Sequence, residues 1–395
     1  MISGDSMASA AAWSRRVALT VTLLVSLIPG GAAIAGSLLG PSHLDRSFCS
    51  LPTYRQTIVY IDDTILVNGS NSWALKLNGR LRASLMPGER VTIVRLSPVT
   101  GTSHEIWSGC WPDLTAEERQ EHRQSWFSTI TSGSLLSQLR QQQSLFTRDI
   151  NRALTEIYAK AHRLQPHTRI RVADAPKKQI IEALASDAAR FSQSHKTNRV
   201  IVYSDLAQKS SIASVFSSPP AAPVDFGTKL GVYFPHTLFY FYGVGSDISG
   251  DPGYLSSAHH LWRQILASMS AALAAMGSNL AVPNRIPADA FHYGVKIDRQ
   301  GETLYGKMWL LTDSDGHLID SWLGISRLWT VPITGIFTCR QGSSCRLRAT
   351  TVGSLTTSSN TESLDMTGPS PMKLTGVVGV RGAVTFPISG NLRKN

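Results

Sequence analysis

The chain has 395 residues, of which 42% are hydrophobic and 16% are charged, and its formal net charge is +11 at pH 7. This length is sufficient for two domains, each with its own hydrophobic core. The basic residues are scattered and form no run that alternates with aromatic side chains. We therefore predict a solvated basic surface and no nucleic-acid partner.

The N-terminus has the three parts of a secretory signal peptide. Arg15 and Arg16 precede an apolar run over 17–28, and Ala33-Ile34-Ala35 follows as a small-x-small cleavage signal. The run is much shorter than the roughly 20 residues that a membrane span needs, and the rest of the sequence contains no run of about 18 apolar residues. We predict that residues 1–35 are removed and that the mature protein is periplasmic or secreted, without a membrane span. The alternative is an uncleaved N-terminal anchor.

Four cysteines in an exported chain predict two disulfides. Cys339 and Cys345 have a spacing that suits a bridge across a hairpin. Cys49 and Cys110 then form the second pair, which would tie the start of the first domain to its sheet. Because each cysteine has a partner in this scheme, we do not expect a thiol nucleophile.

Residues 36–284 alternate between apolar runs and segments with helical spacing. We predict strands at 57–61, 90–96, 200–203 and 238–245, an edge strand at 104–107, and helices at 73–85, 175–195 and 256–276. The polar stretch at about 113–165 is a helical insertion, in which Gly133 separates two helices. Near-continuous apolar strands joined by helices indicate an α/β fold with a doubly wound, mostly parallel sheet.

From residue 285 to 395 the pattern changes to short alternating strands and turns. We predict a small all-β domain, either a sandwich or a barrel. Asp315-Gly316 between two apolar strands predicts a hairpin turn. The preceding Asp313 and Ser314 do not make this a calcium loop, since the glutamate that ends such a loop is missing. The Ser-rich and Thr-rich stretch 354–370 is predicted to be a long loop.

Two strands of the first domain end in polar side chains. Asp62, Asp63 and Thr64 follow the first strand, and Asp205 follows the strand at 200–203. Ligands of open α/β sheets bind at the carboxyl ends of such strands, so these side chains are expected in one crevice. Three carboxylates at close range are costly without a cation or raised pKa values.

This order of elements resembles the von Willebrand factor A-like fold over about residues 55–277. The resemblance is carried by Val59-Tyr60-Ile61-Asp62-Asp63-Thr64, by Ile201-Val202-Tyr203-Ser204-Asp205-Leu206, and by Phe241-Tyr242-Gly243-Val244-Gly245 with the helix after it. In that family the first tip usually reads Asp-x-Ser-x-Ser. Together with a distant threonine and aspartate, it forms a metal-ion-dependent adhesion site.

The resemblance implies a metal site at Asp62, Thr64 and Asp205, with Asp63 beside them, holding Mg²⁺ or Mn²⁺. The site is degenerate because Leu66 stands at the third position and an aliphatic side chain cannot coordinate a hard cation. The distant threonine has no identified counterpart. Magnesium keeps several waters and asks for few protein ligands, so a site remains feasible. The alternative is that the carboxylates only cap helix N-termini.

Two functional hypotheses follow. The first is an exported interaction or adaptor protein, not an enzyme, which binds a protein partner in the cell envelope through the von Willebrand A-like domain, with a divalent cation or by surface alone. The alternative is a metal-dependent envelope hydrolase that uses the same acidic crevice. The Gly-x-Ser-x-Gly, phosphate-loop and His-Glu-x-x-His motifs are absent from the sequence. A hydrolase needs a base accessible in a deep polar pocket, whereas an adaptor needs an exposed tip.

Overall fold

The computed structural model describes residues 43–66, 72–124, 128–163, 170–171, 177–192, 196–217, 224–246, 248–249, 253–325, 329–339, 344–352, 361–379 and 385–393. The predicted leader, residues 1–35, lies outside this part of the chain. None of the helices in the described part combines the length and the apolar character that a membrane span requires.

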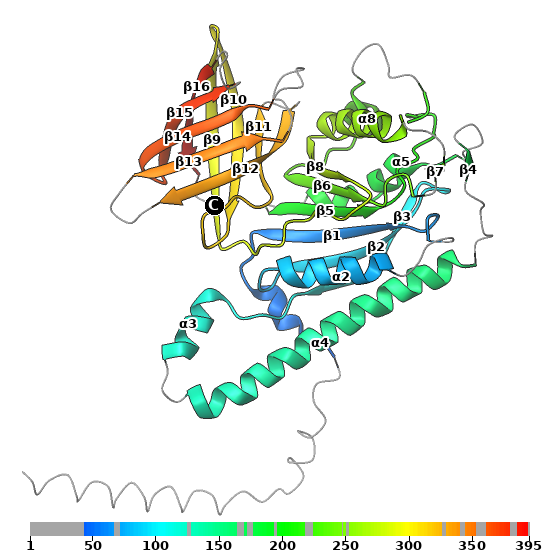
Figure 1. Cartoon of the computed structure of the whole chain (residues 1–395), viewed down its shortest axis with the longest axis horizontal. Helices are drawn as coiled ribbons and strands as arrows, with labels where there is room; N and C mark the ends of the chain where they lie inside the picture. Colours follow the sequence, from blue (N-terminus) through cyan, green and yellow to red (C-terminus); the bar gives the residue numbers. More distant parts are fainter. Residues whose placement is uncertain are drawn as a thin grey trace, which may run out of the picture. The chain divides into compact units, whose positions relative to one another are not determined.

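The first described domain is built on a six-stranded sheet with the order β3-β2-β1-β5-β6-β8 (Figure 1). Its strands are β1 (Arg55–Asp62), β2 (Arg90–Ser97), β3 (Thr102–Cys110), β5 (Thr197–Tyr203), β6 (Thr237–Tyr242) and β8 (Ala271–Gly277). Only β3 runs antiparallel to its neighbour within this sheet. The strand order reverses between β1 and β5, as in other doubly wound sheets. The predicted fold class is confirmed.

Helices cover both faces of the sheet (Figure 1). Ile58 and Tyr60 of β1 pack in a cluster with α5 and α8, whereas Val59 and Ile61 pack with α2 and α4. A strand that is buried on both faces needs apolar side chains at every position, which explains the apolar run in β1. The helical elements are η2 (Arg46–Ser50), α2 (Ser72–Ser84), α3 (Ala116–Gln124), α4 (Ser128–Ala161), α5 (Ile180–Ala185), α6 (Ala189–Ser192), α7 (Phe226–Leu230) and α8 (Tyr254–Ser268). A short parallel pair, β4 (Ile170–Arg171) and β7 (Ile248–Ser249), lies apart from the main sheet.

Three helix predictions need correction. The predicted helix 256–276 ends at Ser268, since Ser270 has a φ of 59° and the alanine-rich segment after it forms β8. Pairing with β6 outweighs the helix propensity of these alanines. The predicted helix 175–195 is two short helices and begins at Ile180. In the insertion, the described part of α3 ends at Gln124 and that of α4 begins at Ser128, and Gly133 lies inside α4.

The second domain is a closed antiparallel barrel with the order β10-β11-β12-β13-β14-β15-β16-β9. Its strands are β9 (Asp289–Arg299), β10 (Glu302–Thr312), β11 (Ser321–Ile325), β12 (Trp329–Cys339), β13 (Cys345–Thr351), β14 (Ser363–Ser370), β15 (Lys373–Gly379) and β16 (Thr385–Leu392). Pairing of Ile297 with Ile388 closes it, and buried side chains such as Tyr293 and Met366 fill it. The sequence pattern does not predict β9. It also predicts a long loop at 354–370, where the structure has β14.

Both predicted disulfides are present. Cys49 in η2 is bonded to Cys110 at the end of β3, and Cys339 is bonded to Cys345 across the β12–β13 pair. The first bridge joins the start of the described domain to the edge of its sheet. No described cysteine is free.

A buried charged network lies at the amino ends of the parallel strands, and we call it the amino-end network. It consists of Arg55, Glu89, Arg199 and Asp320, whose side chains are all fully buried. Arg55 donates to both Glu89 carboxylate oxygens, at 3.0 and 2.8 Å, and to Asp320 at 2.5 Å. Asp320 comes just before β11 and also accepts a bond from Tyr240 of β6. The network therefore ties the barrel to the sheet.

Candidate functional site

The candidate site lies at the opposite, carboxyl edge of the sheet. Asp62 is the last residue of β1, and Asp205 comes two residues after the end of β5. Because β1 and β5 are paired neighbours, with Ile61 opposite Tyr203, the two tips are adjacent. The Ser204 hydroxyl donates to Asp62 Oδ2 at 2.7 Å and so links them directly.

Thr64 and Asp63 take different positions in this site. The amide and the hydroxyl of Thr64 donate to Asp62 Oδ1 at 2.9 and 2.6 Å, which forms an Asx turn. Asp63 instead accepts a bond from the Ser97 hydroxyl at 2.7 Å, and Arg95 Nε lies 3.8 Å from its carboxylate. Burial raises the pKa of Asp63 to about 6, although the Ser97 bond opposes this rise. The third predicted carboxylate therefore bonds to β2 and not to Asp205.

A residue that the sequence did not single out completes the site. Lys178 Nζ donates to Asp205 Oδ2 at 2.7 Å and lies 3.7 Å from Asp62 Oδ2. Lys178 is 5% exposed, Asp205 1% and Asp62 0%. Burial raises the pKa of Asp62, Lys178 opposes this rise and Asp205 adds to it. The signal in the sequence is a lysine just before a helix, and such a residue is ordinarily solvated.

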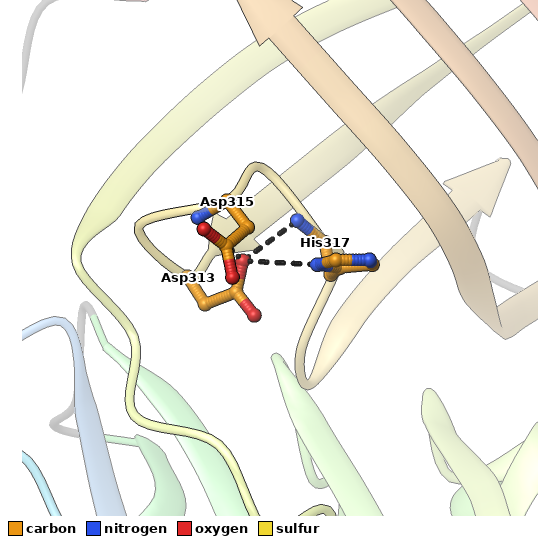
Figure 2. Close-up of side chains that lie close together, drawn as sticks. All are labelled: Asp313, Asp315 and His317. Atoms are coloured by element: carbon orange, nitrogen blue, oxygen red, sulfur yellow. Dashed lines mark hydrogen bonds and ion pairs between the residues drawn. The ribbon is translucent and has the colours of Figure 1, made fainter.

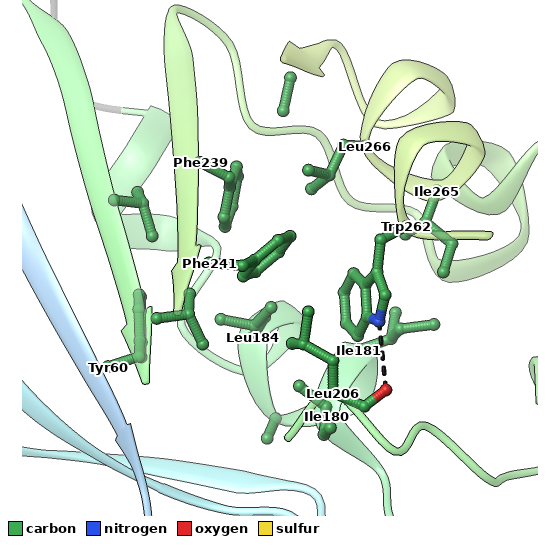
Figure 3. Packing of buried hydrophobic residues seen from close by; sticks show 14 of the residues in the cluster. Tyr60, Ile180, Ile181, Leu184, Leu206, Phe239, Phe241, Trp262, Ile265 and Leu266 are labelled. Atoms are coloured by element: carbon green, nitrogen blue, oxygen red, sulfur yellow. Dashed lines mark hydrogen bonds between the residues drawn. The ribbon is translucent and has the colours of Figure 1, made fainter. Parts of the chain in front are cut away.

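The loop that carries Asp205 is held in place by hydrogen bonds to its backbone carbonyls. The Asp205 carbonyl accepts a bond from the Tyr254 hydroxyl at 2.7 Å. The next residue, Leu206, has a φ of 60°, a left-handed conformation that costs a non-glycine residue about 1–2 kcal/mol. Its carbonyl accepts a bond from the Trp262 indole at 3.3 Å, within the core under α8 (Figure 3). Packing of α8 thus fixes the position of the Asp205 side chain.

The contacts of these residues do not fit a bound divalent ion. Both oxygens of Asp62 accept protein hydrogen bonds, and those of Asp205 accept from the Ala207 amide and from Lys178. Magnesium keeps several waters, whereas these side chains are almost fully buried. Leu66 is packed in the core and offers no oxygen. Metal binding at Asp62, Asp63, Thr64 and Asp205 stays a prediction.

A second group of potential ligands lies in the turn after β10 (Figure 2). Asp313, Asp315 and His317 each offer one ligand atom within 4.8 Å of the others, a spacing that would allow a shared metal ion. Asp313 Oδ1 already accepts bonds from the backbone amides of Asp315 and His317, and its other oxygen pairs with Arg285. These bonds form the hairpin turn that Asp315-Gly316 predicts, and Gly316 has the required positive φ of 83°.

Exposed apolar side chains flank the buried charges of the carboxyl edge. Val99, in the turn between β2 and β3, is 64% exposed, and its carbonyl accepts a bond from Gln179, the neighbour of Lys178. Leu255, in the first turn of α8, is 54% exposed and follows Tyr254, which bonds to the Asp205 carbonyl. We call Thr64, Val99 and Leu255 the carboxyl-edge surface.

The strand order and the antiparallel edge strand, with acidic residues at the tips of β1 and β5, fit the von Willebrand factor A-like fold that the sequence resembles, and an eight-stranded all-β barrel follows this domain. The sequence matches no family model and no curated protein sequence.

Solved structures similar to this chain include two with low scores. One is the ArnB paralog VWA2 from Sulfolobus acidocaldarius, with 10% identity over 80% of this chain and 65% of that chain and a TM-score of 0.28. The other is the human COPII-coat protein Sec24c, with 8% identity over 87% of this chain and 44% of that chain and a TM-score of 0.30. The chain therefore spans less than two thirds of the length of either protein.

Proposed function

We propose that this is an exported interaction or adaptor protein, periplasmic or secreted, that binds a protein partner in the cell envelope with the carboxyl-edge surface of its von Willebrand A-like domain. The two disulfides support export, because such bonds persist in oxidising compartments. The fold supports an interaction role, since this architecture presents loops at the carboxyl edge of its sheet to ligands.

The observation that carries the proposal is the difference between the two edges of the sheet. At the amino edge, Asp320 of the barrel domain bonds to Arg55, and Trp309 and Trp322 share a buried cluster with Val59 of β1. That edge is occupied within the chain itself. At the carboxyl edge, Val99 and Leu255 expose apolar side chains on the two sides of the β1 and β5 tips, which are joined by hydrogen bonds. Exposed apolar side chains around a fixed polar centre suit protein recognition.

The same tip argues against the hydrolase alternative. A general base must come within hydrogen-bond reach of the proton that it removes. Asp62 and Asp205 are buried, and their oxygens already accept bonds from Lys178, Thr64 and Ser204. A substrate could not reach them without breaking several of these bonds. The interaction role requires no such change.

Site-specific photo-crosslinking in the producing cells tests the proposal. A photoreactive amino acid is placed at Val99 or Leu255, and as matched controls at Leu75 on α2 and Tyr305 on β10, which are also highly exposed. We expect one discrete adduct from positions 99 and 255 and none of that mass from 75 and 305. Equal adducts from all four positions, or none from the carboxyl edge, would contradict a partner at this surface.

A further inference from the structure

Two carboxylates that the family resemblance assigns to a metal ion share a cation that belongs to the chain. The ammonium group of Lys178 lies between Asp205 and Asp62, at 2.7 and 3.7 Å from one oxygen of each. We propose that Lys178 takes the place of the divalent ion, so that the tip keeps its structure without any metal. A lysine ammonium is a compact point charge and suits this position better than a planar guanidinium would.

The backbone around Lys178 holds the ammonium in place. Lys178 and Lys209 exchange two backbone hydrogen bonds of 3.0 and 2.9 Å, in an isolated antiparallel bridge. The next amide, of Gln179, donates to the Pro98 carbonyl at 2.8 Å. The Ile181 amide at the start of α5 donates to the buried Gln208 side chain at 3.0 Å. An incoming ion would have to displace a side chain whose backbone is fixed on both sides.

The remaining oxygens of the two carboxylates are already engaged within the protein. Asp62 Oδ1 accepts from the amide and hydroxyl of Thr64, and Asp62 Oδ2 accepts from Ser204. Asp205 Oδ1 accepts from the Ala207 amide at 3.0 Å. The hydroxyls of Thr64 and Ser204 therefore both donate to Asp62 and are not directed towards a separate ion. The whole arrangement is consistent with one buried cation, and Lys178 supplies it.

The test is a calorimetric titration of the purified, oxidised protein with Mn²⁺ alone. The variants are Lys178→Ala, Lys178→Gln as a larger neutral replacement, and Lys177→Ala as the matched control, because Lys177 is exposed and adjacent. We expect no saturable binding at millimolar Mn²⁺ in the wild type or in Lys177→Ala. Removal of the ammonium should create a saturable Mn²⁺ site with a Kd at least about tenfold below the highest Mn²⁺ concentration at which the wild type shows no binding, and Asp205→Asn in the same background should abolish it.

Two outcomes would overturn the inference. One is saturable Mn²⁺ binding by the wild type that Asp205→Asn removes, which would mean that an ion displaces Lys178. The other is a folded Lys178→Ala or Lys178→Gln protein that gains no Mn²⁺ binding, since Lys178 would then not be holding the place of an ion.

Thermal unfolding of the wild type keeps the inference testable if neither variant folds. We expect the same melting temperature with Mn²⁺ and with a chelator, because a ligand stabilises only the state that binds it. A rise with Mn²⁺ that is lost in Asp205→Asn would count against the inference.

Discussion

Two fully buried carboxylates at opposite ends of the same sheet differ in the direction of their pKa shifts. Burial raises the pKa of both, but at the amino end Arg55 and Arg199 outweigh burial and hold the pKa of Glu89 below its usual value. At the carboxyl end a single Lys178 faces two carboxylates, and the pKa of Asp62 remains above its usual value. The number of matched cations, and not the depth of burial, decides the direction.

The two ends of the sheet differ in how completely their buried charges are neutralised. The charges of the amino-end network balance, whereas those of the carboxyl edge balance only in part. The amino-end network has two guanidinium groups and two carboxylates, and it joins residues as distant in sequence as Arg55 and Asp320. Removing one member of such a buried set leaves an uncompensated charge in the core. The carboxyl-edge set has one ammonium group for Asp62 and Asp205 and relies on hydroxyl and amide donors for the rest. A single substitution at the carboxyl edge should therefore change how the free energy of unfolding depends on charge.

The largest expected change in the free energy of unfolding comes from disrupting the amino-end network. Asp320→Ala leaves Arg55 and Arg199 with only Glu89, so the free energy of unfolding should fall by about 3–5 kcal/mol. Guanidinium chloride unfolding measures it. The matched control is Asp365→Ala, which removes an exposed ion pair with Arg346 and should cost no more than about 1 kcal/mol. Similar losses in both variants would show that the amino-end network contributes little.

A double-mutant cycle at the carboxyl end should give an intermediate effect. Lys178→Met and Asp205→Asn each remove one charge of a buried ion pair with a separation of 2.7 Å, and each should lower the free energy of unfolding by about 2–3 kcal/mol. The double variant removes both charges and should lose less than the sum, with a coupling energy of about 1–3 kcal/mol. Urea unfolding of the four proteins in one buffer measures this coupling. Strict additivity would mean that the two groups do not stabilise each other.

The smallest expected effect depends on pH and concerns Asp63. Its pKa is about 6 in the folded protein, against 3.8 as the ordinary value. The folded state therefore holds the proton more tightly than the unfolded chain. Ionisation lowers the free energy of unfolding as the pH rises from about 4 to about 6, and the loss persists above that range.

Asp63→Asn removes this titration while retaining an oxygen that can accept the Ser97 bond. We expect the variant to be more stable than the wild type by about 1–3 kcal/mol at pH 7.5 and equally stable at pH 4. Urea unfolding at the two pH values measures the difference. An advantage of the same size at both pH values would rule out the titration of Asp63 as its cause.

The sequence is informative wherever the signal is local. The apolar run of β1 predicts a strand buried on both faces, and the polar residues after it place Asp62 at the carboxyl edge beside Asp205. The edge strand β8 is missed because its alanines favour a helix until pairing with β6 is formed. Lys178 is missed because its bridge to Lys209 follows no period of the sequence. Contacts set by packing between distant segments are not encoded in any local pattern.

Closure of the barrel has a consequence for the order in which the chain becomes complete during synthesis. β9 must pair with β16, so the ring cannot close until the strand ending at Leu392 has been made. Asp320 belongs to the barrel and follows Arg55 by 265 residues in the sequence, so Arg55 is synthesised long before its second carboxylate. Such long-range pairings slow folding. The first domain should therefore acquire its full resistance to unfolding only after β16 has paired with β9.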